Sequence, residues 1–581
     1  MSEFILFDHV SFAYSLPSGA KIPALNDISF TINKGEYVSV IGANGSGKTT
    51  AAKLMNGLVH PDSGRVLVNG VDTRVSASSR ELFRQVGLIF QDPHDQIVAS
   101  QVEEDTAFGP ENLALAPAEI SARVEEGLHL SGAAHLRQRQ TYLLSAGETQ
   151  RVALAGVLAL HPDCLIFDET TAMLDPRSRR EILSLITDLH DKGYTIVHIT
   201  HDLDETLLAG RILVFQDGQL VLDGSPHWVY KDRSRMQKLG LDVPYLLQFA
   251  RDLQPYFSAL QSFYRTQQAF LADLLTGSGS EQENSLPVLA KPLARNGMIT
   301  FQHVSHTYML GNPLAQTALQ DVSFTVPQGV ATGLVGHTGS GKSTILQHIN
   351  GLIRPQQGKV TVSEFDLSQP VLDIRALRRQ VGLVFQNPEA QFFERYVGDE
   401  IAYAARMLGY HGKLRDLVQH AMHLVGLDFE QFVDRPLQSL SGGQKRRIAL
   451  ASYLVVQPHI LLLDEPFAGL DPQAHQQLSH FVRQLKSDGT TIILSTHTMR
   501  DLLEITDRAL VLRKKHAVFD GGIAQLFNAS ELEEWDLEVP LEILIANALR
   551  QTGIPVPYDC LRWETVLTWL HNNAEGGRVI F

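Results

Sequence analysis

The nine residues "GANGSGKTT" at positions 42–50 carry the strongest structural signal in this chain. They follow the apolar run "EYVSVI" (36–41) and match the pattern of two glycines with four residues between them, the second followed by Lys and then Ser or Thr. Glycines at such places let successive backbone N–H groups turn inward around an anion at the start of a helix. The stretch therefore predicts a strand, a phosphate-binding loop and a helix, in that order.

A second copy of the loop, "GHTGSGKST", occupies 336–344, so that Lys342 lies 294 positions after Lys48. One such match is also compatible with a glycine-rich turn before a helix, but two matches at equivalent places favour two ATP sites. We expect Lys48 and Lys342 to hold the β- and γ-phosphates, and Thr49 and Ser343 to offer hydroxyl groups to Mg²⁺. The nucleotide-binding residues predicted in the two loops are Gly42, Asn44, Gly45, Ser46, Gly47, Lys48, Thr49 and Thr50, and Gly336, Thr338, Gly339, Ser340, Gly341, Lys342, Ser343 and Thr344.

The whole chain repeats itself at nearly the same offset. "VGLIFQDPHDQ" (86–96) returns as "VGLVFQNPEAQ" (381–391), and "CLIFDE" (164–169) returns as "ILLLDE" (460–465). Short apolar runs alternate with helix-compatible stretches, which is typical of an α/β fold with parallel strands. We predict nucleotide-binding domains at 1–235 and 299–527, helical extensions at 236–275 and 528–581, and a linker at 276–298, where "TGSGSEQENS" is small and polar.

Composition limits the class of protein. The 581 residues are 44% hydrophobic, enough for at least two packed domains. The formal charge of −15 disfavours broad nucleic-acid binding, and two cysteines, Cys164 and Cys560, exclude a disulfide framework. The chain does not begin with a basic segment followed by a long apolar one, and nowhere are 18 consecutive residues apolar. We therefore expect neither a secretion signal nor a membrane span.

An acidic pair ends an apolar run in each half, in "LIFDE" (165–169) and "LLLDE" (461–465). The ends of buried parallel strands present such carboxylates at the ligand edge of a sheet. We predict that Asp168 and Asp464 approach Mg²⁺, directly or through water. Glu169 and Glu465 are predicted to orient and polarise the water that attacks the γ-phosphate. Acidic pairs also occur in solvated turns, but their recurrence after both phosphate loops favours catalysis.

"LSGGQ" (440–444), followed by the acidic pair, an "LDP" turn (470–472) and a late histidine, closely resembles the signature of the ATP-binding cassette (ABC) ATPases. The resemblance covers nearly the whole chain and implies two P-loop ABC domains, each with a helical subdomain and a C-terminal helical extension. It further implies that the signature of one cassette closes over ATP held by the other, so that the two cassettes pair within the chain.

The same resemblance implies further site residues. It implies adenine stacking by Tyr14 and Tyr308, metal and water sensing by Gln91 and Gln386, γ-phosphate contact by His201 and His497, and signature contacts by Ser145, Gly147, Ser441, Gly443 and Gln444. Each tyrosine taken alone is equally compatible with strand core, and each histidine with a structural role. Their order along the chain favours the nucleotide roles.

Residues 90–113 and 385–408 are similar to the regions after the glutamine loop in energy-coupling-factor (ECF) ATPases, which drive the import of vitamins or metal ions. This resemblance implies two partners, a transmembrane scaffold and a membrane substrate-binding subunit, and a peripheral location on the cytoplasmic side of the cell membrane. Two alternatives stand beside it. One is a soluble tandem ABC ATPase acting on ribosomes or nucleic acid, disfavoured by the short acidic linker, and the other is a regulatory protein with inactive sites, disfavoured by two intact acidic pairs.

The first signature, "LSAGETQR" (144–151), differs from "LSGGQKRR" (440–447) by Ala146 and Glu148. An alanine in place of glycine is strained wherever the backbone needs positive φ. Because the intact signature would serve the ATP held by Lys48 and Glu169, we expect the Glu169 site to turn over faster than the Glu465 site and Ala146→Gly to raise the rate. Neutral drift at a tolerant position is the competing interpretation.

Overall fold

The computed structural model describes residues 3–15, 21–75, 79–172, 174–276, 297–312, 315–410, 412–440, 442–468, 470, 472–532 and 534–575. These residues form two compact units, Met1–Arg251 with Gln261–Thr266 and Asp252–Leu260 with Gln267–Phe581. Most of the predicted linker (277–296), the signature residue Ser441 and the end of the second predicted extension (576–581) lie outside the described residues.

The first unit contains two sheets. An antiparallel sheet has the strand order β2 (Lys21–Asn33), β1 (Glu3–Ser15), β4 (Ser63–Val68), β5 (Val71–Asp72). The second sheet has the order β10 (Gln219–Gly224), β9 (Arg211–Gln216), β3 (Tyr37–Ile41), β8 (Thr195–Ile199), β7 (Cys164–Asp168), β6 (Val86–Ile89). All its pairs are parallel except β9 with β10.

The parallel sheet explains the unbroken apolar runs of the sequence. Every residue of β3, β6, β7 and β8 is buried, because helices cover a parallel sheet on both faces and leave no strand position facing water. The predicted strand, loop and helix are confirmed, since β3 leads directly into the glycine loop and α1 (Lys48–Asn56) begins at Lys48, the lysine of the loop. Each of these strands ends at the same edge of the sheet.

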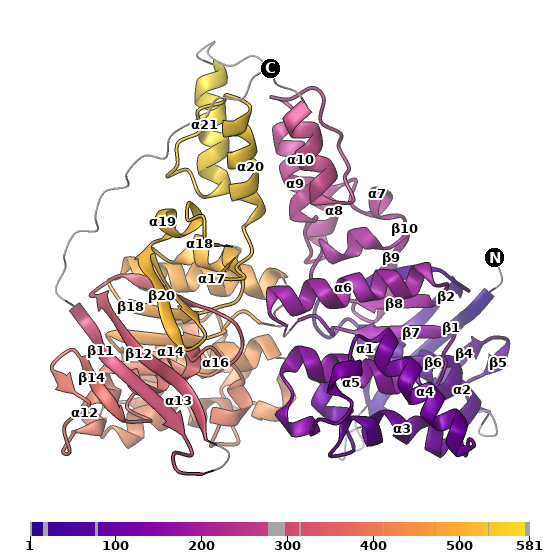
Figure 1. Ribbon diagram of the computed structural model, residues 1–581, viewed down its shortest axis with the longest axis horizontal. Coiled ribbons are helices and arrows are strands. Elements are labelled where there is room, and N and C mark those ends of the chain that lie inside the picture. Colours follow the sequence, from indigo (N-terminus) through magenta and orange to yellow (C-terminus); the bar gives the residue numbers. More distant parts are fainter. Residues whose placement is uncertain are drawn as a thin grey trace. The chain divides into compact units, whose positions relative to one another are not determined.

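The other helices of the first unit are α2 (Ser79–Gln85), α3 (Val102–Asn112), α4 (Pro117–Leu130), α5 (Ala146–Leu158), α6 (Pro176–Asp191), α7 (Pro226–Val229), α8 (Arg233–Lys238) and α9 (Tyr245–Leu253). Helices α3, α4 and α5 pack on one another and form a helical layer of their own (Figure 1). A separate apolar cluster lies between them, with Val102, Val124, Leu128 and Val152 fully or nearly fully buried.

The second unit repeats this arrangement. Its antiparallel sheet has the order β12 (Gln316–Pro327), β11 (Gly297–Tyr308), β14 (Gln357–Val362), β15 (Phe365–Asp366). Its larger sheet has the order β16 (Val381–Val384), β17 (Ile460–Asp464), β18 (Thr491–Ser495), β13 (Ala331–Val335), β19 (Arg508–Arg513), β20 (His516–Gly522). The helices are α11 (Lys342–Ile349), α12 (Ile374–Gln380), α13 (Val397–Met407), α14 (Leu414–Leu424), α15 (Phe429–Phe432), α16 (Gly442–Leu454), α17 (Pro472–Ser487), α18 (Met499–Ile505), α19 (Ile523–Phe527), α20 (Leu541–Gln551) and α21 (Trp563–Glu575).

One helix from the first predicted extension packs within the second unit. Helix α10 (Gln267–Thr276) contacts α20, and Trp563 Nε1 donates a hydrogen bond to Asp252 Oδ2 at 2.9 Å. Phe270 and Leu549 are fully buried, so this packing removes large apolar side chains from water. Across the described ranges, no helix is both long enough and apolar enough to cross a membrane.

Candidate active sites

The first phosphate loop has a shape that requires glycine. Gly42 has φ +156°, and a Cβ there would lie 2.3 Å from the carbonyl oxygen of Phe215. Gly47 has φ +103°, and its Cβ would lie 2.6 Å from the carbonyl oxygen of Ala24. A side chain at either place would collide with backbone that cannot move independently. The second loop repeats both constraints at Gly336 and Gly341.

The loop also holds polar groups suited to a phosphate. The hydroxyl groups of Ser46 and Ser340 are buried and have no hydrogen-bond partner among the described residues. Lys48 Nζ donates to the carbonyl oxygens of Gly42 and Ala43 at 2.8 and 3.1 Å, which holds a buried ammonium group at the mouth of the loop. Lys342 is held in the same way by Gly336 and His337. Buried donors without acceptors and a buried cation fit a polyphosphate.

An aspartate stands beside each helix that follows the loop. Thr49 Oγ1 donates to Asp168 Oδ1 at 3.2 Å, and Asp168 is 5% exposed at the end of β7. Burial, together with the neighbouring Glu169 charge, raises the pKa of Asp168 to about 6. Asp464 accepts a hydrogen bond from Ser495, and burial raises its pKa as well. A desolvated carboxylate next to a hydroxyl group suits Mg²⁺, whose charge would favour the ionised form.

Glu169 occupies a backbone conformation that only a few residues adopt. It has φ +54°, in the left-handed region, which costs of order 1–3 kcal/mol for such a residue and clusters at functional sites. Its carboxylate lies 2.6 Å from His201 Nε2 and accepts a hydrogen bond from Gln91 Nε2 at 3.0 Å. Burial opposes ionisation, but the His201 contact outweighs it, so that the pKa of Glu169 is lowered. The structure therefore brings the three predicted residues together.

The second unit builds the same cluster with small differences. Glu465 has φ +46° and accepts from His497 Nδ1 at 2.9 Å and from Gln386 Nε2 at 3.4 Å. The pKa of Glu465 is lowered in spite of burial, by His497 first and to a smaller extent by the charges of Lys342 and Arg446. Glu465 thus repeats both the left-handed backbone and the carboxylate contacts of Glu169 after the equivalent strand.

The two tyrosines predicted to stack on adenine lie at the ends of β1 and β11. Each is 38% exposed, and each phenol oxygen lies 3.2 Å from a threonine hydroxyl of the helix after the loop, Thr50 for Tyr14 and Thr344 for Tyr308. An exposed ring held beside the phosphate loop suits stacking better than strand core.

The residues of the first signature lie at the start of α5, in the helical layer of the first unit. Ser145 caps α5, because its Oγ accepts from the N–H of Glu148 while the Glu148 carboxylate accepts from the N–H of Ser145. Glu148 is also paired with Arg139 at 2.8 Å, which offsets its charge. Ala146 is the first residue of α5 with ordinary helical φ, and a Cβ at Gly442 would meet open space. The strain expected at Ala146 is therefore absent, which corrects the physical basis of that prediction.

Two groups of residues near the catalytic clusters were not predicted. Arg446 of the second signature donates to the carbonyl oxygens of Ala468 and Gln386, and burial lowers its pKa to about 10. In the first unit, Arg179 forms ion pairs with Asp202, the residue directly after His201, and with Glu205, four residues after His201. The sequence signal for Arg179, Asp202 and Glu205 is their position: Arg179 comes three residues after the "LDP" turn, and the two carboxylates come one and four residues after His201.

Each unit thus brings a glycine loop with a buried lysine, a buried aspartate and a glutamate–histidine pair to one edge of a parallel sheet, an arrangement typical of the P-loop nucleotide hydrolases. The model of the ABC transporter family matches residues 25–172 and 319–468, one match in each half. The chain belongs to this family: it is an ABC-type ATPase and an ATP-binding subunit of an ABC transporter.

Relatives extend over nearly the full chain. A protein of Methanosarcina mazei named "Putative ABC transporter ATP-binding protein" is 32% identical over 95% of this chain and 95% of its own length. A protein of Bacillus subtilis named "Putative HMP/thiamine import ATP-binding protein YkoD" is 31% identical over 90% of this chain and 93% of its own. Among solved structures, cbiO1 from Clostridium perfringens, described as part of the ABC transporter complex cbiONQ, is 33% identical over 41% of this chain and 95% of its own, with a TM-score of 0.37.

Proposed function

We propose that this protein is the energy-coupling subunit of an ECF-type importer that takes up a vitamin or a metal ion. The observation that carries the proposal is that large apolar side chains are exposed in the segment after Gln91 and again in the segment after Gln386. Val98 and Phe108 in the first unit are 59% and 50% exposed, and Phe393 and Met407 in the second are 75% and 57% exposed. Large apolar groups exposed on a surface mark a docking site, and all four side chains lie in segments 92–110 and 387–408, within the two regions that resemble those of ECF ATPases.

Buried polar contacts hold these loops in shape. The Asp105 carboxylate accepts hydrogen bonds from the N–H groups of Val98 and Ala99 at 2.7 and 3.0 Å. In the second unit, Glu400 accepts from Phe393 and Glu394, both at 2.9 Å. A buried carboxylate thus fixes the backbone at Val98 and at Phe393 before any partner arrives, which lowers the ordering cost of docking.

The partners proposed for these segments are the coupling helices of a transmembrane scaffold, assembled with a membrane substrate-binding subunit. Such docking would hold the protein peripherally at the cytoplasmic side of the cell membrane. The Bacillus subtilis relative is named as an HMP/thiamine import protein, which supports a vitamin or vitamin precursor as the transported substrate.

We further propose that the two cassettes pair within the chain, so that each signature completes the ATP site of the other cassette. Ser145 and Gly147, and Ser441, Gly443 and Gln444 on the other side, would then contact ATP. Mg²⁺ would be held by Thr49, Gln91 and Asp168 in one site and by Ser343, Gln386 and Asp464 in the other. The metal would neutralise charge on the β- and γ-phosphates, while the residues of the chain orient water and remove its proton.

The docking proposal is tested by fractionating cells of the native host that express the chain at its normal level. The wild-type chain should sediment with membranes, and the double variant Val98→Asp, Phe393→Asp should move to the soluble fraction. Val371→Asp is the matched control, because Val371 is 90% exposed but lies outside both segments. Retention of the double variant on membranes, or sedimentation of the wild-type chain with ribosomes, would contradict the proposal and favour the soluble alternative.

A further inference from the structure

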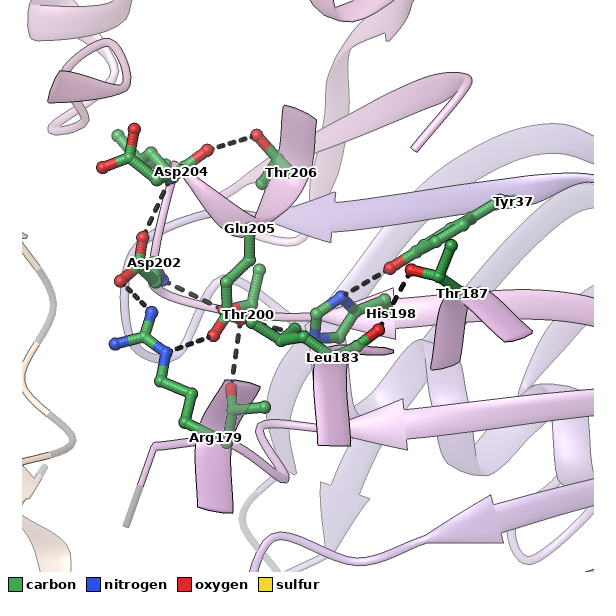
Figure 2. A network of polar contacts seen from close by, with 12 residues as sticks. Tyr37, Arg179, Leu183, Thr187, His198, Thr200, Asp202, Asp204, Glu205 and Thr206 are labelled. Atoms are coloured by element: carbon green, nitrogen blue, oxygen red, sulfur yellow. Dashed lines mark hydrogen bonds and ion pairs between the residues drawn. The ribbon is translucent and has the colours of Figure 1, made fainter. Parts of the chain in front are cut away.

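A polar network in the first unit surrounds the segment that carries His201 (Figure 2). Arg179, on α6, donates from Nε to Glu205 Oε1 at 2.8 Å and from Nη2 to Asp202. Glu205 is only 3% exposed, and its second oxygen, Oε2, accepts from the hydroxyl groups of Thr200 at 2.5 Å and Thr171 at 3.1 Å. One guanidinium group therefore holds two carboxylates that come from the same short segment.

The network reaches both neighbours of the histidine. Asp202, directly after His201, is held by Arg179 itself, and Thr200, directly before it, is held through Glu205. The N–H of Asp202 also donates to Thr200 Oγ1 at 3.0 Å, which closes the turn around His201.

The same network extends to the strand that carries the glutamate. Thr171, two residues after Glu169, donates to Glu205 and so joins the segment of the glutamate to the segment of the histidine. On the far side, His198 Nε2 lies 3.4 Å from Glu205, and the hydroxyl of Tyr37 lies 3.2 Å from His198 Nδ1. The carboxylate of Glu205 thus lies near the buried His198 of β8 and is held by Arg179 on α6.

We propose that Arg179 is a positioning residue for ATP hydrolysis at the first site, which clamps both neighbours of His201 and thereby fixes this imidazole against Glu169. The proposal rests on the roles proposed for Glu169 and His201. Arg179 would act through the 2.6 Å contact between Glu169 and His201. A shift of His201 would alter both that contact and the distance from the ring to a γ-phosphate.

Charge explains why an arginine suits this place. Burial alone would lower the pKa of Arg179, but Asp202 and Glu205 outweigh burial and raise it. Burial would likewise raise the pKa of Asp202, and the guanidinium lowers it. Both partners therefore stay charged across the physiological pH range, and the planar fork of arginine can serve two carboxylates at once.

The second unit lacks this clamp. The residues 296 positions after Arg179, Asp202 and Glu205 are His475, Thr498 and Asp501. His475 Nε2 contacts Asp501 Oδ1 at 2.7 Å. Thr498 is uncharged and cannot form an ion pair equivalent to that of Asp202 with Arg179. The chain thus supplies its own natural variant of the network, in which a titratable ring replaces a permanent cation.

The test uses the purified 581-residue chain with Glu465→Gln, so that the remaining ATP turnover reports the first site. Arg179→Met should lower kcat about tenfold and leave KM for ATP within about twofold, because positioning acts on the reacting geometry more than on nucleotide binding. Arg179→Lys should recover part of the loss. Arg177→Met is the matched control: Arg177 lies on the same helix, pairs only with Glu181 of that helix among the contacts described, and should leave turnover unchanged.

Arg179→His gives the decisive readout. The turnover of Arg179→His, relative to the parent, should be higher at pH 6 than at pH 8. The reason is that a protonated imidazole restores the cation between Asp202 and Glu205. A purely structural role would instead give Arg179→His and Arg179→Met the same pH profile. Equal profiles, or full kcat in Arg179→Met, would overturn the proposal. Should Arg179→Met unfold, the Lys and His variants decide. Turnover that survives Glu169→Gln would instead contradict the assignment of the site itself.

Discussion

His201 Nε2 lies 2.6 Å from Glu169 Oε1, at the edge of the first parallel sheet. A buried carboxylate that is desolvated and yet held ionised by a histidine is suited to attract and orient a water molecule. The equivalent contact in the second unit uses the other ring nitrogen, His497 Nδ1. The two clusters thus share their chemistry and differ in how the imidazole is held.

Replacing Lys48 and Lys342 together by alanine should abolish Mg²⁺-dependent ATP hydrolysis. Each ammonium group is buried at the mouth of its glycine loop, where we propose that it binds the β- and γ-phosphates. Release of phosphate from ATP by the purified double variant is the measurement. The single variants Lys48→Ala and Lys342→Ala serve as controls for each site, and turnover equal to wild type in the double variant would contradict the assignment.

Ala146→Gly should leave the rate of ATP hydrolysis unchanged within about twofold, because Ala146 begins α5 in helical geometry and carries no strain to release. The substitution should lower stability by less than about 1 kcal/mol, since glycine is a weaker helix former. Steady-state turnover and a denaturant unfolding curve measure the two effects. A clear rise in the rate of ATP hydrolysis would contradict this prediction and would show that Ala146 in the first signature causes a difference in rate between the two sites.

Asp168→Asn should raise the unfolding temperature of the nucleotide-free protein at pH 8. The pKa of Asp168 is raised to about 6 in the folded state, so ionisation there is unfavourable and stability is lost as pH rises from about 4 through 6. The gain should be at most about 3 kcal/mol and should vanish below pH 4. Thermal unfolding across pH tests this, and a variant less stable than wild type at pH 8 would refute it.

His475→Gln should destabilise the second unit more at pH 6 than at pH 9. Burial would lower the pKa of His475, but Asp501 outweighs it and the pKa is raised. Stability from the pair is therefore fully present below the unfolded pKa of about 6.5 and is lost as pH rises through the folded value. Differential unfolding curves at the two pH values are the measurement, with Asp501→Asn as the partner control. An equal loss at both pH values would show that the contact is uncharged.

Much of the fold could be predicted because its signals are local. The glycine pattern of the two loops specifies a backbone that favours glycine, since a Cβ at Gly42 or Gly336 would lie 2.3 Å from a backbone carbonyl oxygen. The unbroken apolar runs specify buried parallel strands, and the carboxylates at their ends lie at one edge because parallel strands share a direction. The repeat at 294–296 positions specifies that all of this occurs twice.

Other features depended on the tertiary structure, because they arise between segments far apart in sequence. The left-handed backbone at Glu169 and Glu465 and the ordinary helical φ at Ala146 are properties of how each residue is packed, which no residue type reveals. Arg179 meets Asp202 and Glu205 only because α6 runs beside the end of β8. The sequence by itself determined which groups could react, and the tertiary structure decided which of them are held at reacting distance, since only packing converts sequence separation into contact.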